Sequence, residues 1–365
     1  MKPVPVFFHR LFLYGNVLIA AGLICSAFLP MMNPATFWPA GFAGLAFPFL
    51  WLLSVIFIPG WLIARKKYWL ISVFALMISF RGMALSWGFN LFSSGKTATD
   101  RSFTVMTFNS SSMGLSGYSE NPKVREHIYH ILKAARPDVL CIQEFYTNEH
   151  PDQQPHLENI AHTGGYPYHY FAKHYTNWKT WHWGTVIFSR FPIVDTARIA
   201  FRGGYKGNED LISVKLLVHK DTVQVLTGHL SSYKLNGHDY QAMGNPDGGK
   251  IKSMMGKMRR SFASRASQAQ IMAGEISRSK YPLVVTGDFN DIPLSYTYRT
   301  IRGDALQDAF LEMGSGFGRT FSALSPTLRI DYVLAGKEFT VEDFSIYREK
   351  GLQHFPVMAR LSLER

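Results

Sequence analysis

The sequence predicts an α+β protein in which a bundle of three transmembrane helices precedes a sandwich of two β-sheets covered by helices. Residues 1–100 consist mainly of long apolar runs, whereas residues 103–365 alternate between short helical and β-strand patterns. Several of the predicted strands end in a polar residue, which is typical of a ligand site at the edge of a sheet. These observations separate a membrane region from a globular domain.

The N-terminal region is predicted to cross a membrane three times. Residues 11–29 and 37–64 contain no charged side chain, and each run can span a hydrocarbon core of about 30 Å as a helix. A third run, at residues 68–92, is interrupted only by Arg81, and we expect it to span although such a charge costs about 2.5–3.5 kcal/mol at mid-helix. A cleaved signal peptide is the alternative for the first run, but no small-residue cleavage site follows it at Pro30.

Positively charged residues predict how these helices are oriented. Lys2 and Arg10 flank the start of the first helix, and three basic residues at positions 65–67 join the second and third, whereas residues 30–36 carry no charge. Lysine and arginine in short loops stay in the cytoplasm. Three crossings then place the globular domain outside, so we expect a multi-pass protein of a bacterial inner membrane with a periplasmic domain.

Composition fits a tethered domain. Residues 93–102 are polar and are predicted to form a short flexible linker to the globular domain at 103–365. Outside residues 1–100 the net charge is only +6, which is too small to indicate nucleic acid by itself.

The two cysteines, Cys25 and Cys141, lie in a membrane helix and a buried strand, so no disulfide is expected. The lipid bilayer is the partner that the helices imply, and no protein partner can be inferred.

The globular region carries distinct helix and hairpin signals. A helix begins at Pro122 and stops before Pro137, with apolar residues at helical spacing between them. A second helix is predicted at residues 261–279, and two consecutive strands at residues 211–218 and 222–229 have the pattern of a hairpin. This alternation fits two sheets covered by helices.

The most informative stretch is an apolar strand at residues 284–287 that runs into Asp288, Phe289 and Asn290. Residues two apart on an extended chain point to the same side, so Asp288 and Asn290 can converge on one ligand. This arrangement suits a metal-held phosphate. An Asx turn that merely closes the strand is the alternative.

Other strands end in polar residues in the same way. These candidate site residues are Asn109, Glu144, His229 and Asp331, with His354 directly before the last strand. Each has a structural alternative: Glu144 could be a solvated strand end, His229 could be bonded within a turn, and Asp331 could pair with Arg329. Their joint occurrence in order favours a catalytic site.

Taken in order, these residues and the strand at 183–193 resemble the endonuclease/exonuclease/phosphatase superfamily, the deoxyribonuclease I-like fold, over residues 103–363. The resemblance implies a four-layer α/β/β/α sandwich and a membrane-anchored bacterial member of that superfamily. It also implies the roles of the site residues. Metal binding falls to Glu144, Asn109 and Asp288, catalysis to His354, Asp331, Asp288, Asn290 and His229, and substrate binding to Asn290 and His229.

One position departs from the resemblance. The family usually has an aspartate directly before the last histidine, where this chain has Gln353. That aspartate is a second metal contact in some members, so a second ion is in doubt while the imidazole of His354 is retained.

Elementary chemistry agrees with these roles. Phosphate ester hydrolysis needs a cation on the phosphoryl oxygens, a positioned water and a proton donor for the leaving group. Mg²⁺, or Mn²⁺, keeps several waters and takes one or two carboxylates, so Glu144 with Asp288 or Asn109 suffices for one ion. Histidine titrates near neutral pH, and Asp331 can orient His354 as in a serine hydrolase triad.

The sequence leaves the substrate open. We expect a metal-dependent phosphoesterase that hydrolyses phosphodiesters or phosphomonoesters, with a lipid or headgroup phosphate favoured by the neighbouring bilayer. A nuclease acting on extracellular DNA or RNA and a catalytically lapsed binding module are the alternatives. The aromatic stretch at 166–183 could stack bases, meet the membrane interface or be core strand. The basic segment at 250–260 could bind anionic headgroups or be a solvated helix face.

Overall fold

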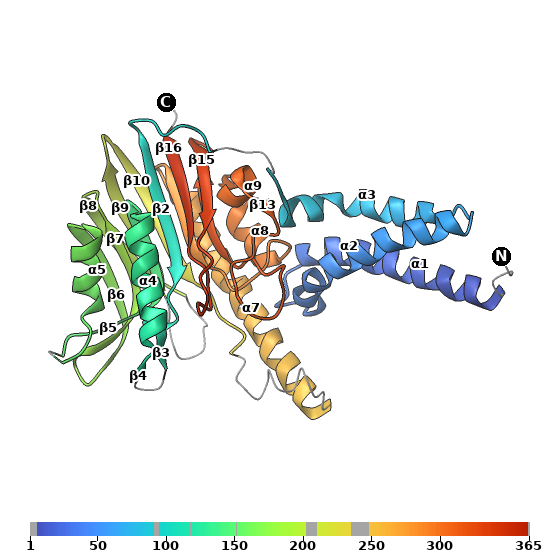
Figure 1. Ribbon diagram of the computed structural model, residues 1–365, viewed down its shortest axis with the longest axis horizontal. Helices are drawn as coiled ribbons and strands as arrows, with labels where there is room; N and C mark the ends of the chain where they lie inside the picture. The colour runs from blue at the N-terminus through green and yellow to red at the C-terminus, as the bar shows by residue number, and fades with distance from the viewer. Residues whose placement is uncertain are drawn as a thin grey trace.

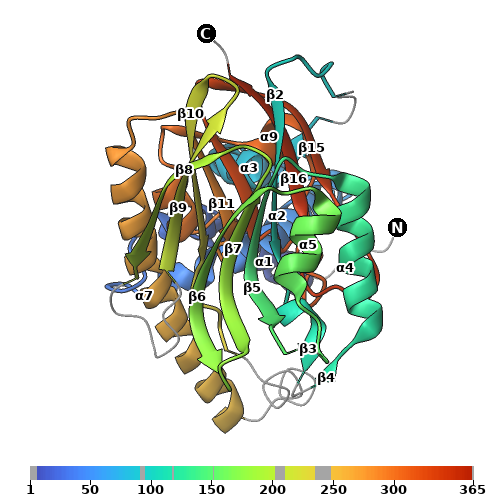
Figure 2. The ribbon, with the colours of Figure 1, turned by 90° about the vertical axis from the view of Figure 1, so that its left-hand side faces the viewer.

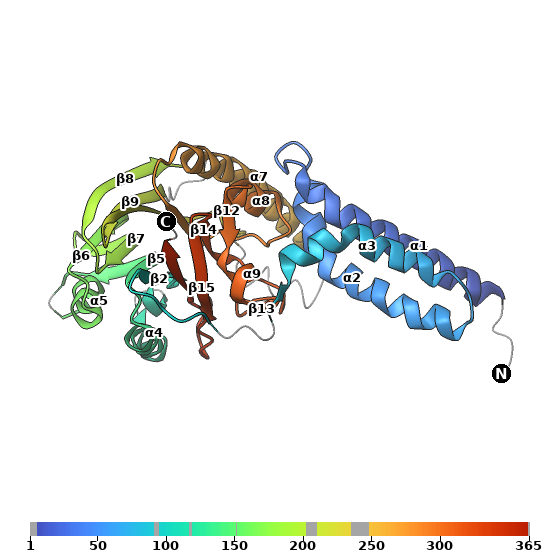
Figure 3. The same cartoon turned by 90° about the horizontal axis from the view of Figure 1, so that it is seen from above.

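A computed structural model of the chain describes residues 6–90, 95–116, 119–150, 152–201, 210–234 and 248–363. Three long helices form an elongated bundle that projects from one side of a globular domain (Figure 1). The N-terminal end of the first helix and the turn between the second and third lie at the far end of this bundle (Figure 3).

The bundle consists of α1 (Val6–Phe28), α2 (Pro39–Ile63) and α3 (Trp69–Ser86), with a short 3₁₀ turn, η1 (Leu29–Met31), after α1. All three are long and apolar enough to cross a membrane. The third helix ends at Ser86, before the expected residue 92, so Arg81 lies toward the domain end of α3 rather than at its middle. Residues 91–92 and residues 93–94 of the predicted linker lie outside the described part of the chain.

Side chains in the bundle are arranged as in a membrane protein rather than a soluble one. Large apolar side chains face outward, among them Leu18, Ile56 and Phe74, which are 73%, 55% and 59% exposed. Small polar groups lie inside, where the Ser72 hydroxyl donates to Asn16 Oδ1 at 2.7 Å. Transmembrane helices associate through such small residues and interhelical hydrogen bonds, because lipid surrounds their apolar faces.

The globular domain contains two six-stranded mixed sheets. The first has the order β12 (Leu306–Asp308), β14 (Asp331–Gly336), β11 (Leu283–Asp288), β10 (Asp221–His229), β9 (Asp210–Val218) and β8 (Ile193–Ala200). The second has the order β15 (Phe339–Ile346), β16 (Val357–Leu363), β2 (Ser102–Asn109), β5 (Val139–Asn148), β7 (Trp181–Ser189) and β6 (Tyr168–Asn177). One neighbouring pair in each sheet is parallel, namely β10 with β11 and β2 with β5.

Helices cover the outer faces of both sheets (Figure 2). The second sheet packs against α4 (Pro122–Ala135) and α5 (His156–Gly164), and the first packs against α7 (Gly248–Arg278) and α8 (Tyr296–Arg302). The central apolar layer lies between the two sheets. The predicted four-layer α/β/β/α sandwich is therefore confirmed. Shorter elements are α9 (Ala309–Met313), η2 (Ser112–Gly114), β1 (Gly88–Phe89), β3 (Leu115–Ser116), β4 (Ser119–Glu120) and β13 (Ser315–Gly316).

Most local predictions agree with these elements. The helix expected at Pro122 is α4, whose first turn is capped by the Asn121 side chain. The predicted helix at 261–279 starts earlier, at Gly248, so the basic segment 250–260 forms the first turns of α7. The single strand predicted at 183–193 was wrong: β7 ends at Ser189, and the chain turns through Pro192 into β8 of the other sheet.

The bundle packs directly on the globular domain. A Cβ on Gly44 of α2 would lie 2.0 Å from the carbonyl oxygen of Leu294, and the buried Leu294 side chain joins the apolar cluster of the bundle. Strand β1 pairs with β13, and the Asn90 amide donates to the Leu311 carbonyl at 2.9 Å. Within the predicted linker, the Lys96 N–H donates to the Glu342 carbonyl at 2.8 Å, so its described part is attached to the domain.

This contact predicts that Gly44→Ala destabilises the full-length protein. The new methyl group must displace the Leu294 backbone, and overpacking of this kind costs about 1–3 kcal/mol. We expect a Tm several degrees below the wild-type value in thermal unfolding in nanodiscs. Gly22→Ala on α1 is the matched control, because its Cβ would meet only Leu50 at 3.6 Å. Equal Tm values for the two variants would contradict a close helix–domain contact.

Candidate active site

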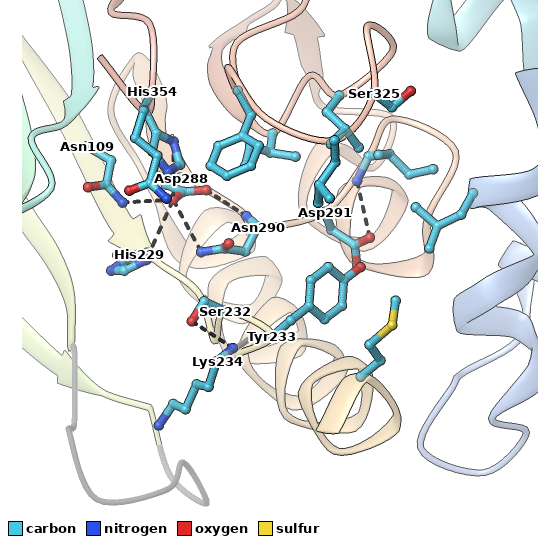
Figure 4. Close-up of a pocket in the computed structure, with 18 of the residues that line it drawn as sticks. Asn109, His229, Ser232, Tyr233, Lys234, Asp288, Asn290, Asp291, Ser325 and His354 are labelled. Atoms are coloured by element: carbon cyan, nitrogen blue, oxygen red, sulfur yellow. Dashed lines mark hydrogen bonds and ion pairs between the residues drawn. The ribbon is translucent and has the colours of Figure 1, made fainter. Parts of the chain in front are cut away.

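Sheet register aligns three of the predicted site residues. His229 ends β10 beside Asp288, which ends the parallel strand β11. Asp331 begins β14 and lies opposite Asp288 across the antiparallel pair. The three residues therefore form one row across the edge of the sheet. Figure 4 shows His229 and Asp288 of this row beside one pocket.

Glu144 reaches this mouth from the other sheet by way of an irregular strand. The pairing of β5 with β7 shifts between Ile142 and Phe145, and Glu144 has a φ of 47°. A left-handed backbone at a residue other than glycine costs of order 1 kcal/mol, and such strain is common at functional sites. The Ser110 hydroxyl donates to the Glu144 carbonyl at 2.9 Å and holds this conformation.

Asn109 joins the two carboxylates. Its Nδ2 donates to Glu144 Oε1 at 3.1 Å and to Asp288 Oδ2 at 2.9 Å. His229 Nε2 lies 3.6 Å from the same two oxygen atoms. Burial raises the pKa of Asp288, while the neighbouring imidazoles of His354 and His229 favour its charged form. Two carboxylates from different sheets thus face one small polar space.

The last residues of β11 and the turn that follows them allow β11 to lie close to β10. Gly287 has a φ of +136°, and a Cβ there would lie 2.0 Å from the Gly228 carbonyl oxygen, so only glycine fits beside β10. Asn290 has a φ of 51°, and its N–H donates to Asp288 Oδ1 at 2.8 Å. Its Nδ2 donates to the Leu230 carbonyl at 2.9 Å. These bonds combine the predicted Asx turn with a side chain that lines the pocket.

Asp331 and His354 form a buried pair. His354 Nδ1 lies 3.1 Å and 3.2 Å from the two Asp331 carboxylate oxygens, and the Asp331 N–H donates to the Thr320 hydroxyl at 3.1 Å. Burial alone would lower the pKa of His354, but the carboxylates of Asp331 and Asp288 outweigh it and raise the pKa to about 9. Because Nδ1 is occupied by Asp331, Nε2 is the ring nitrogen that can act on a substrate.

All seven residues singled out in the sequence come together. Six line one pocket, namely Asn109, Glu144, His229, Asp288, Asn290 and His354, and Asp331 supports His354 from behind. Gln353 also lines this pocket, and its Oε1 accepts a hydrogen bond from the Ser111 hydroxyl at 3.2 Å. The position of the missing aspartate therefore faces the site. Arg329 does not pair with Asp331 but with Asp308.

Sequence reasoning missed several lining residues. Asp291 lies directly after Asn290 and accepts a hydrogen bond from the buried Arg265 at 3.2 Å. Arg265 also donates to the Ser231 carbonyl and lies over the Tyr233 ring at 4.5 Å. Asp291 could have been found from its position beside the Asp288 turn. Tyr233 lines the pocket from the segment that follows β10. Arg265 supports Asp291 without lining the pocket and carries no local signal, because only tertiary folding brings α7 to the site.

The donor set fits a hard divalent cation. Glu144 and Asp288 supply carboxylate oxygens of the kind that magnesium and manganese accept, and the Glu144 side chain is 37% exposed to solvent. Asn109 directs Nδ2 at both carboxylates while its Oδ1 accepts from the Ser111 N–H at 3.0 Å, so its amide would have to turn to offer an oxygen to an ion. The ligand atoms of Asp288, Asp331 and His354 also lie within 4.8 Å of one another. Since His354 Nδ1 is engaged by Asp331 at 3.1 Å, the Glu144–Asp288 side offers the better oxygen site.

The fold and these residues define a domain of the class that hydrolyses phosphoesters. A sequence model of the endonuclease/exonuclease/phosphatase family matches residues 106–352, so the chain belongs to this family. Its members are generally phosphodiesterases or nucleases. A model of a domain of unknown function matches residues 9–84, the region of the bundle. No curated protein sequence matched the chain.

Solved structures share the fold at low identity. An endonuclease/exonuclease/phosphatase from Beutenbergia cavernae is 21% identical with a TM-score of 0.50, covering 72% of each chain. The human Nocturnin catalytic domain with bound sulfate anion is 18% identical with a TM-score of 0.51, covering 73% of this chain and 96% of that one. D. rerio TDP2 complexed with single-strand DNA product is 13% identical with a TM-score of 0.51, covering 72% of this chain and 100% of that one.

The buried pair predicts that His354→Ala lowers kcat by at least about 10²-fold, the usual loss when general acid–base catalysis is removed. Asp331→Asn should cause a similar loss, because an amide can favour the wrong imidazole tautomer. Steady-state kinetics on the full-length protein measures both. Asp195→Asn, an exposed carboxylate on β8 paired with Lys215, is the isosteric control. Wild-type kcat in Asp331→Asn would remove Asp331 from the mechanism.

Proposed function

We propose that the chain is a membrane-anchored phosphoesterase that depends on Mg²⁺ or Mn²⁺ and hydrolyses phosphate esters on the extracytoplasmic side of a bacterial inner membrane. The observation that carries this proposal is the convergence of Glu144 and Asp288 around Asn109, beside the Asp331–His354 pair. Such a site provides oxygen ligands for one cation and a positioned imidazole for proton transfer.

Glu144 and Asp288, with Asn109 turned to present its amide oxygen, would hold the ion, which would polarise the phosphoryl oxygens and stabilise the charge that develops on them. His229 Nε2 lies beside both carboxylates, so it can contact a phosphoryl oxygen of a phosphate bound there. Asn290 is fixed by its bonds to Asp288 and Leu230 and can orient the phosphate. Positioning and electrostatics supply most of the catalysis in phosphoryl transfer.

The reaction itself is a displacement at phosphorus. A water molecule oriented by Asp288 and Asn290 forms the new P–O bond, and the bond to the leaving oxygen breaks. With a pKa near 9, His354 carries a proton at neutral pH, and Asp331 holds its ring in place. Donation of that proton from Nε2 to the leaving oxygen, together with transfer of the attacking water's proton to the Asp288 carboxylate, balances the step, and proton exchange with solvent then restores both groups.

The distribution of positive charge supports the proposed side of the membrane. The turn between α2 and α3 contains Arg65, Lys66 and Lys67, and it lies at the end of the bundle away from the globular domain (Figure 3). Because basic loops stay in the cytoplasm, the domain would lie on the opposite side. A nuclease and a catalytically lapsed binding module are the alternative functions. Assays of hydrolysis on phosphate esters and on DNA or RNA distinguish them.

The metal assignment predicts that Glu144→Gln abolishes both Mg²⁺ binding and turnover. The amide keeps the shape of the side chain but lacks the negative charge that a hard cation requires. Calorimetric titration of Mg²⁺ into full-length protein measures binding, and hydrolysis of bis(4-nitrophenyl) phosphate and 4-nitrophenyl phosphate with and without EDTA measures turnover. Glu158→Gln on the exposed face of α5 is the control. Equal Mg²⁺ affinity in Glu144→Gln and Glu158→Gln would reject Glu144 as a metal ligand. A wild-type protein that is inactive on both esters and on DNA and RNA would indicate a catalytically lapsed module.

The topology predicts the behaviour of a reporter enzyme that is active only in the periplasm. Fused after Asp100, the reporter should be active, because three spans lead to the outside. Fused after Lys66, it should be silent, because the basic turn is cytoplasmic. The reverse pattern would overturn the proposed side of the membrane. The control for this experiment is the same pair of fusions carrying a reporter that is active only in the cytoplasm.

A further inference from the structure

The pocket that holds the catalytic cluster has a second, apolar half. Its volume is about 340 Å³, within the range of small-molecule sites. One side presents the polar residues described above, and the other is lined by Leu45, Ile292, Phe321, Leu324, Leu328 and Ile330. In Figure 4 the labelled catalytic residues lie on one side of the pocket, and the ribbon of the N-terminal bundle lies beyond the other. Hydrolysis of a phosphate ester does not itself require this apolar wall.

Leu45 belongs to α2, a helix long and apolar enough to cross a membrane. It packs against the buried Ile292, Phe321 and Ile330 of the globular domain. Gly44, next to it, allows the helix to approach Leu294 at backbone distance. The membrane bundle therefore completes the wall of the active-site pocket, and the domain is not merely held near the bilayer.

The level of Leu45 relative to the bilayer can be judged from aromatic residues. Trp38 directly precedes α2 and is 41% exposed, and Trp87 directly follows α3 at the same end of the bundle. Tryptophan is enriched at the membrane–water interface. Leu45 follows Trp38 by seven residues, about 10 Å of helical rise toward the far end of the bundle. The apolar wall thus reaches the depth at which lipid chains begin.

An exposed leucine extends the same wall at its rim. Leu324 is 55% exposed and has a φ of 67°, which is unfavourable for a residue with a branched apolar side chain. The pocket adjoins a second cavity of about 520 Å³ whose lining includes Lys234, Lys257 and Arg260. The two cavities share Ser232, Tyr233 and Lys234. The site therefore combines an apolar wall that includes the membrane helix with a neighbouring basic cavity.

From this division we propose that the substrate is a membrane lipid phosphate ester, with an apolar chain against Leu45 and Leu324, the phosphate at Asp288 and His354, and any anionic headgroup toward Lys257 and Arg260. A nucleic acid strand would leave the apolar wall without a partner and would be better matched by a continuous basic groove. This inference rests on the proposed phosphoesterase activity and adds the substrate class.

The test uses full-length protein in nanodiscs and two probes, ethyl 4-nitrophenyl phosphate and octyl 4-nitrophenyl phosphate. Each fully buried methylene favours binding by about fourfold, so partial burial of the octyl chain should raise kcat/KM at least tenfold over the ethyl ester. Leu45→Ala should lower the octyl-to-ethyl ratio at least threefold. The ratio is internal to each sample, so it does not depend on the fraction of folded protein. Leu324→Ala, at an exposed position, should lower it in the same direction.

Leu52→Ala is the matched control. Leu52 lies on the same helix as Leu45, is as exposed as Leu324 at 55%, and does not line the pocket. It should keep the wild-type ratio, and this comparison removes the effect of ester partitioning into the bilayer. Metal-dependent hydrolysis with equal ratios in wild type, Leu45→Ala and Leu324→Ala would overturn the lipid inference and leave the phosphoesterase standing. Preference for a single-stranded oligonucleotide over the octyl ester would also overturn it. Absence of metal-dependent hydrolysis of either ester would overturn both proposals.

Discussion

The site depends on the buried carboxylate of Asp288. It is fully enclosed, yet it contacts Asn109, Asn290 and His354, so most polar groups of the pocket are positioned relative to it. A buried carboxylate without partners would be too costly to keep charged. The parallel pairing of β10 with β11 and the antiparallel pairing of β11 with β14 supply these partners at fixed register. A shift of one residue in either pair would turn the partner side chains to the opposite face of the sheet.

Two local irregularities, one in each sheet, shape the place where the site residues meet. The bulge in β5 turns Glu144 into the pocket while its neighbour Gln143 stays buried and donates to Thr227 of the first sheet at 2.9 Å. Gly287 lets β10 and β11 approach closely at the row of site residues. Neither feature strengthens its strand. Each feature costs some local stability, which the rest of the folded sandwich offsets. In return, carboxylates from two sheets can face one space.

The sequence predicted the strand ends well and the surroundings poorly, for a physical reason. Asp288, Asn109 and His229 each end an apolar run. The parallel pairing of β10 with β11 brings His229 and Asp288 to a common edge, whereas Asn109 ends β2 of the other sheet and was grouped with them by its place in the order of the motifs. Arg265 lies in the middle of a helix whose pattern indicates only an amphipathic face, and nothing local shows that it bonds to Asp291. The end of α3 at Ser86 was also missed, because the apolar run continues into β1, where pairing with β13 replaces helical bonding.

The contact between the bundle and the domain changes how the membrane region should be understood. A flexible tether would leave the site free to move relative to the bilayer and would need no glycine at a helix surface. Here Gly41 and Gly44 of α2 would each clash with the domain if they carried a Cβ, against Phe262 and Leu294 respectively. Arg329, which is buried and paired with Asp308, also donates to the Leu85 carbonyl near the end of α3 at 3.0 Å. Because the same α2 surface supplies Leu45 to the pocket, the packing that fixes the domain on the helices also shapes the site. Stability of the interface and the shape of the pocket are therefore coupled through one helix face.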